Sequence, residues 1–291
     1  MIVVLGSGGQ VGRSLKLIKP KHIKACFLNK KKCDITNFQI LESHIKNKKP
    51  KFVINLAAYT NVTKAEIYKK DAKNVNSKSV KNLSLLSNKY NFIFLHISTD
   101  YVFNGKNKKN YNEKNIPDPI SYYGKSKLLG ENHIIKNSKK YIIIRTSGIY
   151  SHYESSFLYK ILYKAKNNKE IYIVSDQICY PTYAFDLAKL LWNIVSKEKN
   201  LSLNEIYHFS GHENALSWFD FAKKTFKYAK KYNSFLPTIK KINAMDYKDK
   251  VKRPINSCLS NKKINKIFIN KTNINKNIKE SVDLFYKYNS Q

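Results

Sequence analysis

The first turn of the chain constrains its fold more than any other feature. An aliphatic run at 1–6 leads directly into GSGGQVG at 6–12, which opens a predicted helix over 10–17. The first of the spaced glycines permits a tight turn, the second lets the backbone approach a pyrophosphate, and the third lets the helix pack close to a sheet. Between a first strand and a helix, this turn predicts a dinucleotide site. Its expected members are Gly6, Gly9, Gln10, Val11 and Gly12.

Strands and helices alternate through the first half of the chain. Apolar β-branched runs predict strands at 1–6, 25–29, 51–57, 92–98 and 141–147. Helices are predicted at 10–17, 38–45, 75–89 and 121–135. Strands this apolar are typical of a parallel sheet covered by helices on both faces. Residues 1–150 are therefore predicted to form a doubly wound α/β (Rossmann) domain that binds NAD(P).

The pattern loosens after residue 150. Amphipathic helices are predicted at 155–166, 184–197 and 218–232, with short strands at 170–175 and 205–211. We interpret 151–291 as a smaller substrate-binding lobe, partly interleaved with the first domain. The Lys/Asn-rich tract at 261–280 is expected to be a surface segment, held loosely by Ile264, Ile267 and Ile269.

The net charge of +34 comes from 54 Lys and Arg residues against 20 Asp and Glu residues. Only Arg13, Arg145 and Arg253 are arginines, and the lysines are spread through every segment. A protein that grips nucleic acid more often uses Arg, which makes bidentate contacts. A solvated basic surface that attracts nucleotide-bearing substrates is the preferred interpretation, and no specific nucleic-acid partner is expected.

The sequence predicts a cytoplasmic protein without a membrane partner. Its apolar runs are too short to cross a bilayer, and Met1 leads straight into a strand rather than a signal peptide. The four cysteines are scattered without zinc-ligand spacing, so neither a disulfide framework nor a metal site is predicted.

The end of the second strand bears on the cofactor. An NAD-preferring site places an acidic residue there, but this chain has Asn29-Lys30-Lys31-Lys32. Lysines attract the 2′-phosphate of NADPH, so NADPH is the preferred cofactor and NADH the alternative. Asn29 and Lys30 are expected to contact it. Asp34 and Ile35 are expected to bracket the adenine, although Asp34 could instead cap the following helix.

A tyrosine and a lysine one helical turn apart carry the predicted chemistry. Tyr123 and Lys127 share one helix face, and an ammonium beside a phenol is expected to lower the phenol's pKa. Tyr123 is then able to give a proton to a carbonyl oxygen as hydride reaches the carbon. Thr99, at the end of the fourth strand, is placed to donate to the same oxygen or tune the tyrosine.

Motifs along the whole chain resemble the dTDP-4-dehydrorhamnose reductase family of extended short-chain dehydrogenases/reductases. They are GQVG (9–12), VINLAAYTNVTKAE (53–66), STDYVFNG (98–105), YGKSKLLGE (123–131), RTSGIY (145–150), DQICYPT (176–182), SWFDFA (217–222) and RPINSCLS (253–260). This resemblance implies reduction of the C4 ketone of dTDP-4-dehydro-L-rhamnose with NADPH or NADH. The product, dTDP-L-rhamnose, is a precursor of cell-surface polysaccharides.

The resemblance also implies residue roles. Tyr123 is implied as the proton donor, Lys127 as its partner and Thr99 as the hydroxyl that tunes it. The residues implied to line the cofactor cleft are Ala58, Tyr59 and Thr60. Asp100 is implied to contact the sugar, and Arg253 to close the carboxyl lobe over the nucleotide sugar.

Two departures from the family pattern leave alternatives open. Gly148 stands where the family has Trp, which widens the sugar pocket for another dTDP-4-keto-6-deoxy sugar or leaves a gap for a neighbouring side chain. Ser14 stands where some members carry a glutamate that helps hold Mg²⁺ between subunits. A nucleotide-sugar epimerase or dehydratase and a non-catalytic NADP-binding homologue remain alternatives. RNA binding is a further alternative, which rests on net charge alone. A homodimer is also expected.

Overall fold

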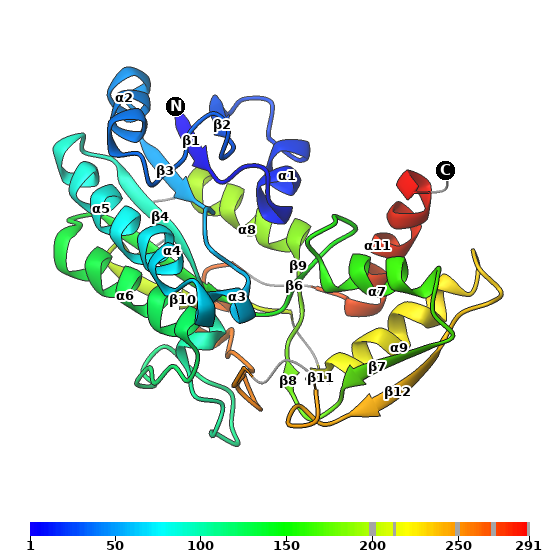
Figure 1. The fold of residues 1–291 in the computed structure, drawn as a ribbon. Helices are drawn as coiled ribbons and strands as arrows, with labels where there is room; N and C mark the ends of the chain where they lie inside the picture. Colours follow the sequence, from blue (N-terminus) through cyan, green and yellow to red (C-terminus); the bar gives the residue numbers. More distant parts are fainter. Residues whose placement is uncertain (198–201, 212–213, 248–250, 269–271, 290–291) are drawn as a thin grey trace.

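A six-stranded parallel sheet forms the centre of the computed structural model, in the order β10-β5-β4-β3-β1-β2 (Figure 1). The structure describes residues 1–197, 202–211, 214–247, 251–268 and 272–289. The strands are β1 (Ile2–Leu5), β2 (Ala25–Leu28), β3 (Phe52–Asn55), β4 (Ile93–Thr99), β5 (Tyr141–Thr146) and β10 (Glu205–His208). The predicted doubly wound α/β class is confirmed.

Alternate side chains of each strand divide between two apolar layers. Val4 and Ile54 face the layer that includes helices α1 and α8, whereas Val3 and Val53 face the layer of α2, α5 and α6. The flanking helices are α1 (Gln10–Leu17), α2 (Phe38–Lys48), α5 (Ser79–Lys89), α6 (Tyr122–Asn137) and α8 (Ala184–Ser196). Because both faces are covered, the strands are mostly apolar, as the sequence pattern indicated.

The connection between β3 and β4 is less regular than predicted. The helix predicted over 75–89 is a π-helix η1 (Asn74–Lys78) followed by α5, and two short helices that were not predicted, α3 (Val62–Ile67) and α4 (Lys69–Lys73), precede it. Apolar spacing does not distinguish a π-helix from an α-helix, because the wider turn only shifts the face of the side chains that follow. The irregular turn buries Asn76 beside α6.

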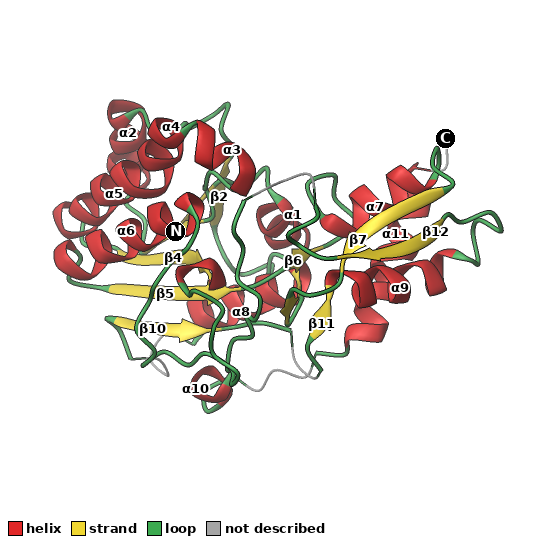
Figure 2. Ribbon diagram, turned by 60° about the horizontal axis from the view of Figure 1, so that its bottom comes forward, coloured by secondary structure: helices red, strands yellow, loops and turns green. Residues whose placement is uncertain are grey.

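The carboxyl-terminal half contributes to two bodies. Strand β10, predicted in the second lobe, pairs with β5 in the main sheet, and α8 covers that sheet. A separate apolar cluster forms around the parallel pair β7–β12, which Figure 2 shows apart from β4, β5 and β10. Its elements are α7 (Phe157–Ala165), β7 (Glu170–Val174), α9 (Trp218–Ala229), β12 (Thr238–Ile242) and α11 (Ile274–Asn289). The domain boundary at residue 150 remains a prediction, since the sheet takes a strand from beyond it.

Short elements join the two bodies. The parallel pair β6 (Ile149–Tyr150) and β9 (Thr182–Tyr183) follows β5, and β8 (Ile178–Cys179) pairs with β11 (Leu216–Ser217). The remaining elements are a 3₁₀ helix η2 (Asp100–Val102) and α10 (Lys262–Asn265).

The expected loose surface tract at 261–280 is wrong in its second part. Helix α11 begins at Ile274, and Ile274 and Ile278 are buried in the second cluster because they lie one turn apart on the same face. Ile264 is also buried, in the cluster beneath the main sheet, and Ile267 packs against that cluster. Ile269 lies outside the described residues.

Glycine 12 joins the first turn to the first helix. A Cβ at Gly12 would lie 2.4 Å from the Cα of Ser7, closer than backbone atoms tolerate. A Cβ at Gly8, in the same turn, would meet only the Cβ of Asn29 at 3.6 Å. Gly12 therefore packs closely against the Gly-rich turn, whereas the contact predicted for it was with the sheet.

We expect Gly12→Ala to lower the free energy of unfolding by about 1–3 kcal/mol, because the new methyl group forces the turn away from the helix. Gly8→Ala, the matched control, should change it by less than about 1 kcal/mol. Urea unfolding followed by circular dichroism measures both. Equal effects of the two substitutions would contradict the role of close packing at Gly12.

Candidate active site

A cavity of about 940 Å³ opens at the carboxyl ends of β1, β3, β4 and β5. Parallel sheets of this kind bind ligands at that edge, where helices begin and backbone N–H groups are free. The predicted site residues that line the cavity are Gly6, Gly9, Gln10, Val11, Gly12, Lys30, Asp34, Ile35, Ala58, Tyr59, Thr60, Thr99, Asp100, Tyr123, Lys127, Gly148 and Arg253. The structure thus brings together residues from distant parts of the chain, while their individual roles remain predictions.

Asn29 is the exception. It is absent from the cavity lining, and its side-chain oxygen accepts a hydrogen bond from the backbone N–H of Lys32 at 3.0 Å. Asn29 thus holds the turn after β2, and its predicted cofactor contact is not supported by its position. Lys30, from the same turn, does line the cavity, and its side chain is 85% exposed.

The start of α1 fits a pyrophosphate. Gly9 precedes the helix in an extended conformation, and no side chain caps the first helical N–H groups. These donors and the positive end of the helix dipole favour an anion. The side chain of Gln10 is held at the same place by the hydroxyl of Ser151, which donates to its Oε1 at 2.7 Å.

Asp34 and Ile35, which were predicted to bracket the adenine, line the cavity next to Lys30. Ile35 is buried, and the carboxylate of Asp34 accepts hydrogen bonds from the backbone N–H and the hydroxyl of Thr36 at 2.9 and 2.7 Å. Lys30 Nζ lies 3.8 Å from the same carboxylate. Asp34 therefore stabilises its own turn as well as lining the cavity, while Asn37 caps α2.

Tyr123 stands in the first turn of α6, next to the end of β4. Ser121 begins the helix by accepting a hydrogen bond from the N–H of Gly124 at 3.2 Å. The ring of Tyr123 meets that of Tyr101 edge-on, with centroids 5.8 Å apart. Burial raises the pKa of Tyr123 to about 12, and a hydrogen bond with the hydroxyl of Thr99 acts in the opposite direction.

The expected lowering of the phenol's pKa by Lys127 is wrong. The amine of Lys127 is directed to the interior, where Nζ lies 3.1 Å from His96 Nε2 and donates to the carbonyl oxygen of Ile97 at 2.7 Å. Desolvation therefore dominates at Tyr123, and the phenol keeps its proton. Burial also lowers the pKa of Lys127 to about 8, against the attraction of the Glu131 carboxylate.

The loop after β3 is fixed by a residue that sequence reasoning missed. Asn76 Oδ1 accepts from the backbone N–H of Tyr59 at 2.8 Å, and its Nδ2 donates to the carbonyl of Tyr59 at 3.0 Å. The same Nδ2 lies 2.9 Å from the hydroxyl of Ser126 on α6. Asn76 thus positions the cavity-lining loop against the helix that carries Tyr123. Only the π-helix brings it there, and no sequence signal marks that turn.

Asp100, which the resemblance implies to contact the sugar, lines the cavity beside Thr99. Its carboxyl accepts a hydrogen bond from the Thr99 hydroxyl at 3.0 Å, and Asp100 is only 3% exposed. Burial raises the pKa of Asp100 to about 7, while hydrogen bonds from Ser257 and Thr99 act in the opposite direction. Asp100 therefore exchanges its proton near neutral pH.

Gly148 has a left-handed backbone, with φ of +51°. A Cβ at this position would lie 3.0 Å from Cys179 Sγ and 3.5 Å from Trp218 Cη2. Trp218 and Cys179 also line the cavity, so neighbouring side chains border the place where the family has its own Trp. The sequence left open a wider sugar pocket or a gap for a neighbouring side chain. The structure favours the second alternative, because Trp218 at the start of α9 borders the gap.

Arg253 connects the carboxyl-terminal segment to the first half of the chain. Its Nη2 donates to the hydroxyl of Thr63 on α3 at 3.3 Å, and its Nη1 donates to the carbonyl of Val251 at 3.4 Å. The guanidinium group lies within the cavity lining, which suits the predicted contact with a diphosphate.

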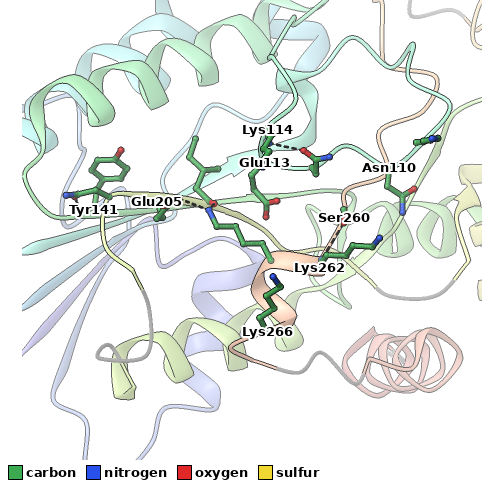
Figure 3. A pocket seen from close by; sticks show the side chains of 13 residues that line it. Asn110, Glu113, Lys114, Tyr141, Glu205, Ser260, Lys262 and Lys266 are labelled. Atoms are coloured by element: carbon green, nitrogen blue, oxygen red, sulfur yellow. Dashed lines mark hydrogen bonds and ion pairs between the residues drawn. The ribbon is translucent and has the colours of Figure 1, made fainter.

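A second cavity, of about 960 Å³, lies along the edge strand β10 (Figure 3). Its lining is basic, but Lys263 Nζ is paired with Glu205 Oε2 at 2.6 Å and donates to the carbonyl of Ile206 at 2.7 Å. Glu113 accepts from the backbone N–H of His208 at 2.9 Å. None of the predicted catalytic residues lines this cavity, and it does not favour RNA binding over a solvated lysine surface.

Among the described residues, none of the helices combines the length and the apolar character that a membrane span needs. No group of three or more His, Cys, Asp or Glu side chains that could hold a metal ion occurs in that part of the chain. Ser14, at the family's glutamate position, is buried and donates to the carbonyl of Gln10 at 2.9 Å.

The parallel sheet, the Gly-rich turn and the Thr99–Tyr123–Lys127 set at the carboxyl edge define the class of extended short-chain dehydrogenases/reductases. The family model of the RmlD substrate binding domain matches residues 1–287. Together with the relatives described next, this match shows that the chain belongs to the dTDP-4-dehydrorhamnose reductase family.

Similar proteins agree with this assignment. The dTDP-4-dehydrorhamnose reductase of Aggregatibacter actinomycetemcomitans is 39% identical over 276 residues, which cover 92% of each protein. That of Sinorhizobium fredii is 33% identical over 270 residues, covering 92% of this chain and 91% of the relative. The crystal structure of the Bacillus anthracis dTDP-4-dehydrorhamnose reductase in complex with NADP has a TM-score of 0.89 and 29% identity, covering 97% of this chain and 98% of that one.

The raised pKa of Asp100 predicts a pH dependence of stability. Between the unfolded value near 4 and the folded value of about 7, the folded state binds a proton that the unfolded state has lost. Stability contributed by Asp100 is therefore full below pH 4 and is lost as the pH rises to 7, by up to about 1.4 kcal/mol per unit. Asp100→Asn should remove this loss, as measured by urea unfolding at a series of pH values.

Asp246→Asn is the matched control, because Asp246 is exposed on the surface. It should keep the pH slope of the unmodified protein. An unchanged slope in Asp100→Asn would show that the carboxyl is ionised throughout this range.

Proposed function

We propose that this protein reduces the C4 ketone of dTDP-4-dehydro-L-rhamnose to dTDP-L-rhamnose with NADPH, for the synthesis of cell-surface polysaccharides. The observation that carries the proposal is the convergence of Thr99, Tyr123 and Lys127 on one cavity with the Gly-rich turn, in a chain of this family. A related dTDP-4-keto-6-deoxyhexose is the alternative substrate.

Tyr123 acts as the proton donor to the C4 oxygen. Its raised pKa suits this direction of reaction, because a phenol that keeps its proton at neutral pH is available as an acid when charge develops on the oxygen. Thr99 is placed to donate a second hydrogen bond to the same oxygen once its hydroxyl turns away from Asp100, to which it donates at 3.0 Å in the ligand-free protein. Lys127 holds the cofactor's ribose. The bound NADPH supplies the hydride that reaches C4 from the nicotinamide ring.

Charged groups at both ends of the cavity support the choice of ligands. Lys30, at the β2 end, suits the 2′-phosphate of NADPH, and NADH remains the alternative cofactor. Arg253, on the carboxyl-terminal segment, suits the diphosphate of the nucleotide sugar, with Asp100 at the sugar hydroxyls and Gly148 beside the ring. The Gly9 start of α1 fits the cofactor's pyrophosphate.

The alternatives predict different outcomes. An epimerase or dehydratase recycles its nicotinamide, whereas a reductase consumes one NADPH per sugar. A non-catalytic homologue would bind NADPH without reducing any ketosugar. The family assignment and the intact Thr99–Tyr123–Lys127 set favour the reductase over both.

We also propose a cytoplasmic homodimer. All four cysteines are free thiols, which supports a reducing compartment. Helices α5 and α6 pack beside one another and each exposes large apolar side chains, Leu85 on α5 and Leu129 and Ile135 on α6, which supports association through these helices.

We expect the purified protein to oxidise NADPH stoichiometrically when given dTDP-4-dehydro-L-rhamnose, followed by loss of nicotinamide absorbance. Tyr123→Phe should reduce kcat by about 10²- to 10⁴-fold, because it removes the general acid. Tyr122→Phe, one residue earlier and outside the cavity lining, is the control and should retain activity. Undiminished turnover by Tyr123→Phe would contradict the role assigned to the phenol.

We expect Lys30→Ala to weaken NADPH binding by about fivefold, the ~1 kcal/mol of an exposed ion pair, and to leave NADH binding nearly unchanged. Fluorescence titration measures both dissociation constants. Lys31→Ala, the neighbouring lysine outside the cavity lining, should affect neither. Equal losses for NADPH and NADH in Lys30→Ala would place the 2′-phosphate elsewhere.

A further inference from the structure

The hydroxyl of Thr99 carries a single proton, and in this structure that proton is held by Asp100. Thr99 Oγ1 donates to Asp100 Oδ1 at 3.0 Å and accepts the backbone N–H of Tyr101 at 3.2 Å. Thr99 and Asp100 are 6% and 3% exposed, and both line the cavity. Because a hydroxyl group donates only one hydrogen bond, Thr99 is unable to donate to a ketone oxygen in this arrangement.

The contact between Thr99 and Asp100 is able to work in either direction. An ionised carboxylate only accepts hydrogen bonds, so Thr99 must donate to it. A protonated carboxyl group carries one O–H donor, which is able to donate to Thr99 Oγ1 across the same 3.0 Å. The Thr99 oxygen then accepts from Asp100 and from the N–H of Tyr101, which occupies both of its lone pairs. Its own proton is thereby released toward the cavity.

We propose that Asp100 is a positioning residue that sets the direction of the Thr99 hydroxyl. As a neutral acid, Asp100 donates to Thr99, which in turn donates to the C4 oxygen of the ketosugar. As a carboxylate, it holds the Thr99 proton and places a negative charge near the oxygen on which charge develops, which slows reduction. The effect at C4 rests on the proposed function, whereas the direction of the hydrogen bond between Asp100 and Thr99 does not.

The proton balance of the reaction is unchanged by this arrangement. The hydride still comes from NADPH and the proton from Tyr123, so Thr99 and Asp100 neither gain nor lose a proton in the step. Only the direction of their shared hydrogen bond differs between the two forms of Asp100. The heavy atoms stay in place, because the same 3.0 Å separation suits a donor on either side.

The surroundings of Asp100 make its neutral form accessible near neutral pH. Burial raises the pKa of Asp100 to about 7, against hydrogen bonds from Ser257 and Thr99. The phenols and thiols around the carboxyl group are uncharged at pH 7, because burial raises the pKa of each; they are Tyr101 on η2, Tyr123 on α6, Cys179 on β8 and Cys258 on the carboxyl-terminal segment.

Two cations line the cavity from the elements next to Asp100, and both have partners of their own. Lys127 of α6 donates to the carbonyl of Ile97 at 2.7 Å, and the Glu131 carboxylate attracts its charge. Arg253 of the carboxyl-terminal segment donates to the hydroxyl of Thr63 at 3.3 Å. The donors that act on Asp100 itself are neutral hydroxyl and backbone groups.

Titration of the Asp100 carboxyl carbon by ¹³C NMR, assigned by correlation with its own backbone, tests the hydrogen bond without NADPH or ketosugar. We expect a midpoint at about pH 7. Thr99→Val should raise the midpoint by about one unit, because the carboxylate loses the hydrogen bond that stabilises it. Thr99→Ser keeps the hydroxyl and should keep the midpoint. A midpoint below about pH 5, or one that Thr99→Val leaves unchanged, would overturn the proposal.

The pH dependence of kcat/KM with NADPH and the ketosugar tests the consequence for catalysis. In the unmodified protein we expect kcat/KM to fall by about tenfold per pH unit above about pH 7, as Asp100 ionises. Asp100→Asn does not ionise, and its amide is able to donate to Thr99 as the neutral acid does. Its kcat/KM should therefore begin to fall only at about pH 8, where Lys127 loses its proton.

Asp246→Asn, at an exposed position outside the cavity lining, is the matched control and should keep the fall above about pH 7. A purely structural role for Asp100 would lower kcat/KM in Asp100→Asn by the same factor at every pH and leave that fall in place. This result would refute the inference even if the protein proves to be the proposed reductase. Absence of turnover by the unmodified protein at every pH would refute the proposed function instead, and the NMR titration then decides the direction of the hydrogen bond by itself.

Discussion

The parallel register of the central sheet is the constraint on which the site depends. Leu5 of β1 pairs with Asn55 of β3, Asn55 with His96 of β4, and Thr99 of β4 with Thr146 of β5. Because all these strands run the same way, the Gly-rich turn and Thr99 emerge at one edge. No long-range contact between their side chains is needed to bring them together, since backbone pairing alone does so.

Buried polar groups then fix the conformation of the loop that follows β3 at that edge of the sheet. Asn55 holds the backbone of Ala57, and Asn76 holds both backbone groups of Tyr59, so the loop after β3 has little freedom. An unpaired buried amide or carbonyl costs about 1–3 kcal/mol, which makes each partner of such a network hard to replace singly. The loop after β3 is therefore held in one conformation, because its polar groups are paired with buried side chains.

Local patterns explain why the fold and most of the cavity lining were predictable. Strand apolarity, the glycine spacing and the four-residue interval from Tyr123 to Lys127 are each readable from neighbouring residues. The sheet membership of β10, the burial of Asn76 by a π-helix and the packing of α11 depend on tertiary contacts. In α11 the frequent Lys and Asn residues concealed an apolar face. The direction of the Tyr123 pKa was wrong because the sequence gives the spacing of a lysine but not the partner of its amine.

The surface charge and the site chemistry act over different ranges. The net charge of +34 is carried mostly by exposed lysines, whose influence in physiological salt extends about 8 Å. It concentrates dianionic nucleotides near the protein but is screened before it reaches a buried phenol. Within the cavity, Tyr123 is uncharged at neutral pH and Asp100 has a pKa of about 7. Mutations that remove surface lysines should therefore affect the encounter with the nucleotide. Mutations that ionise the buried groups should instead affect proton transfer.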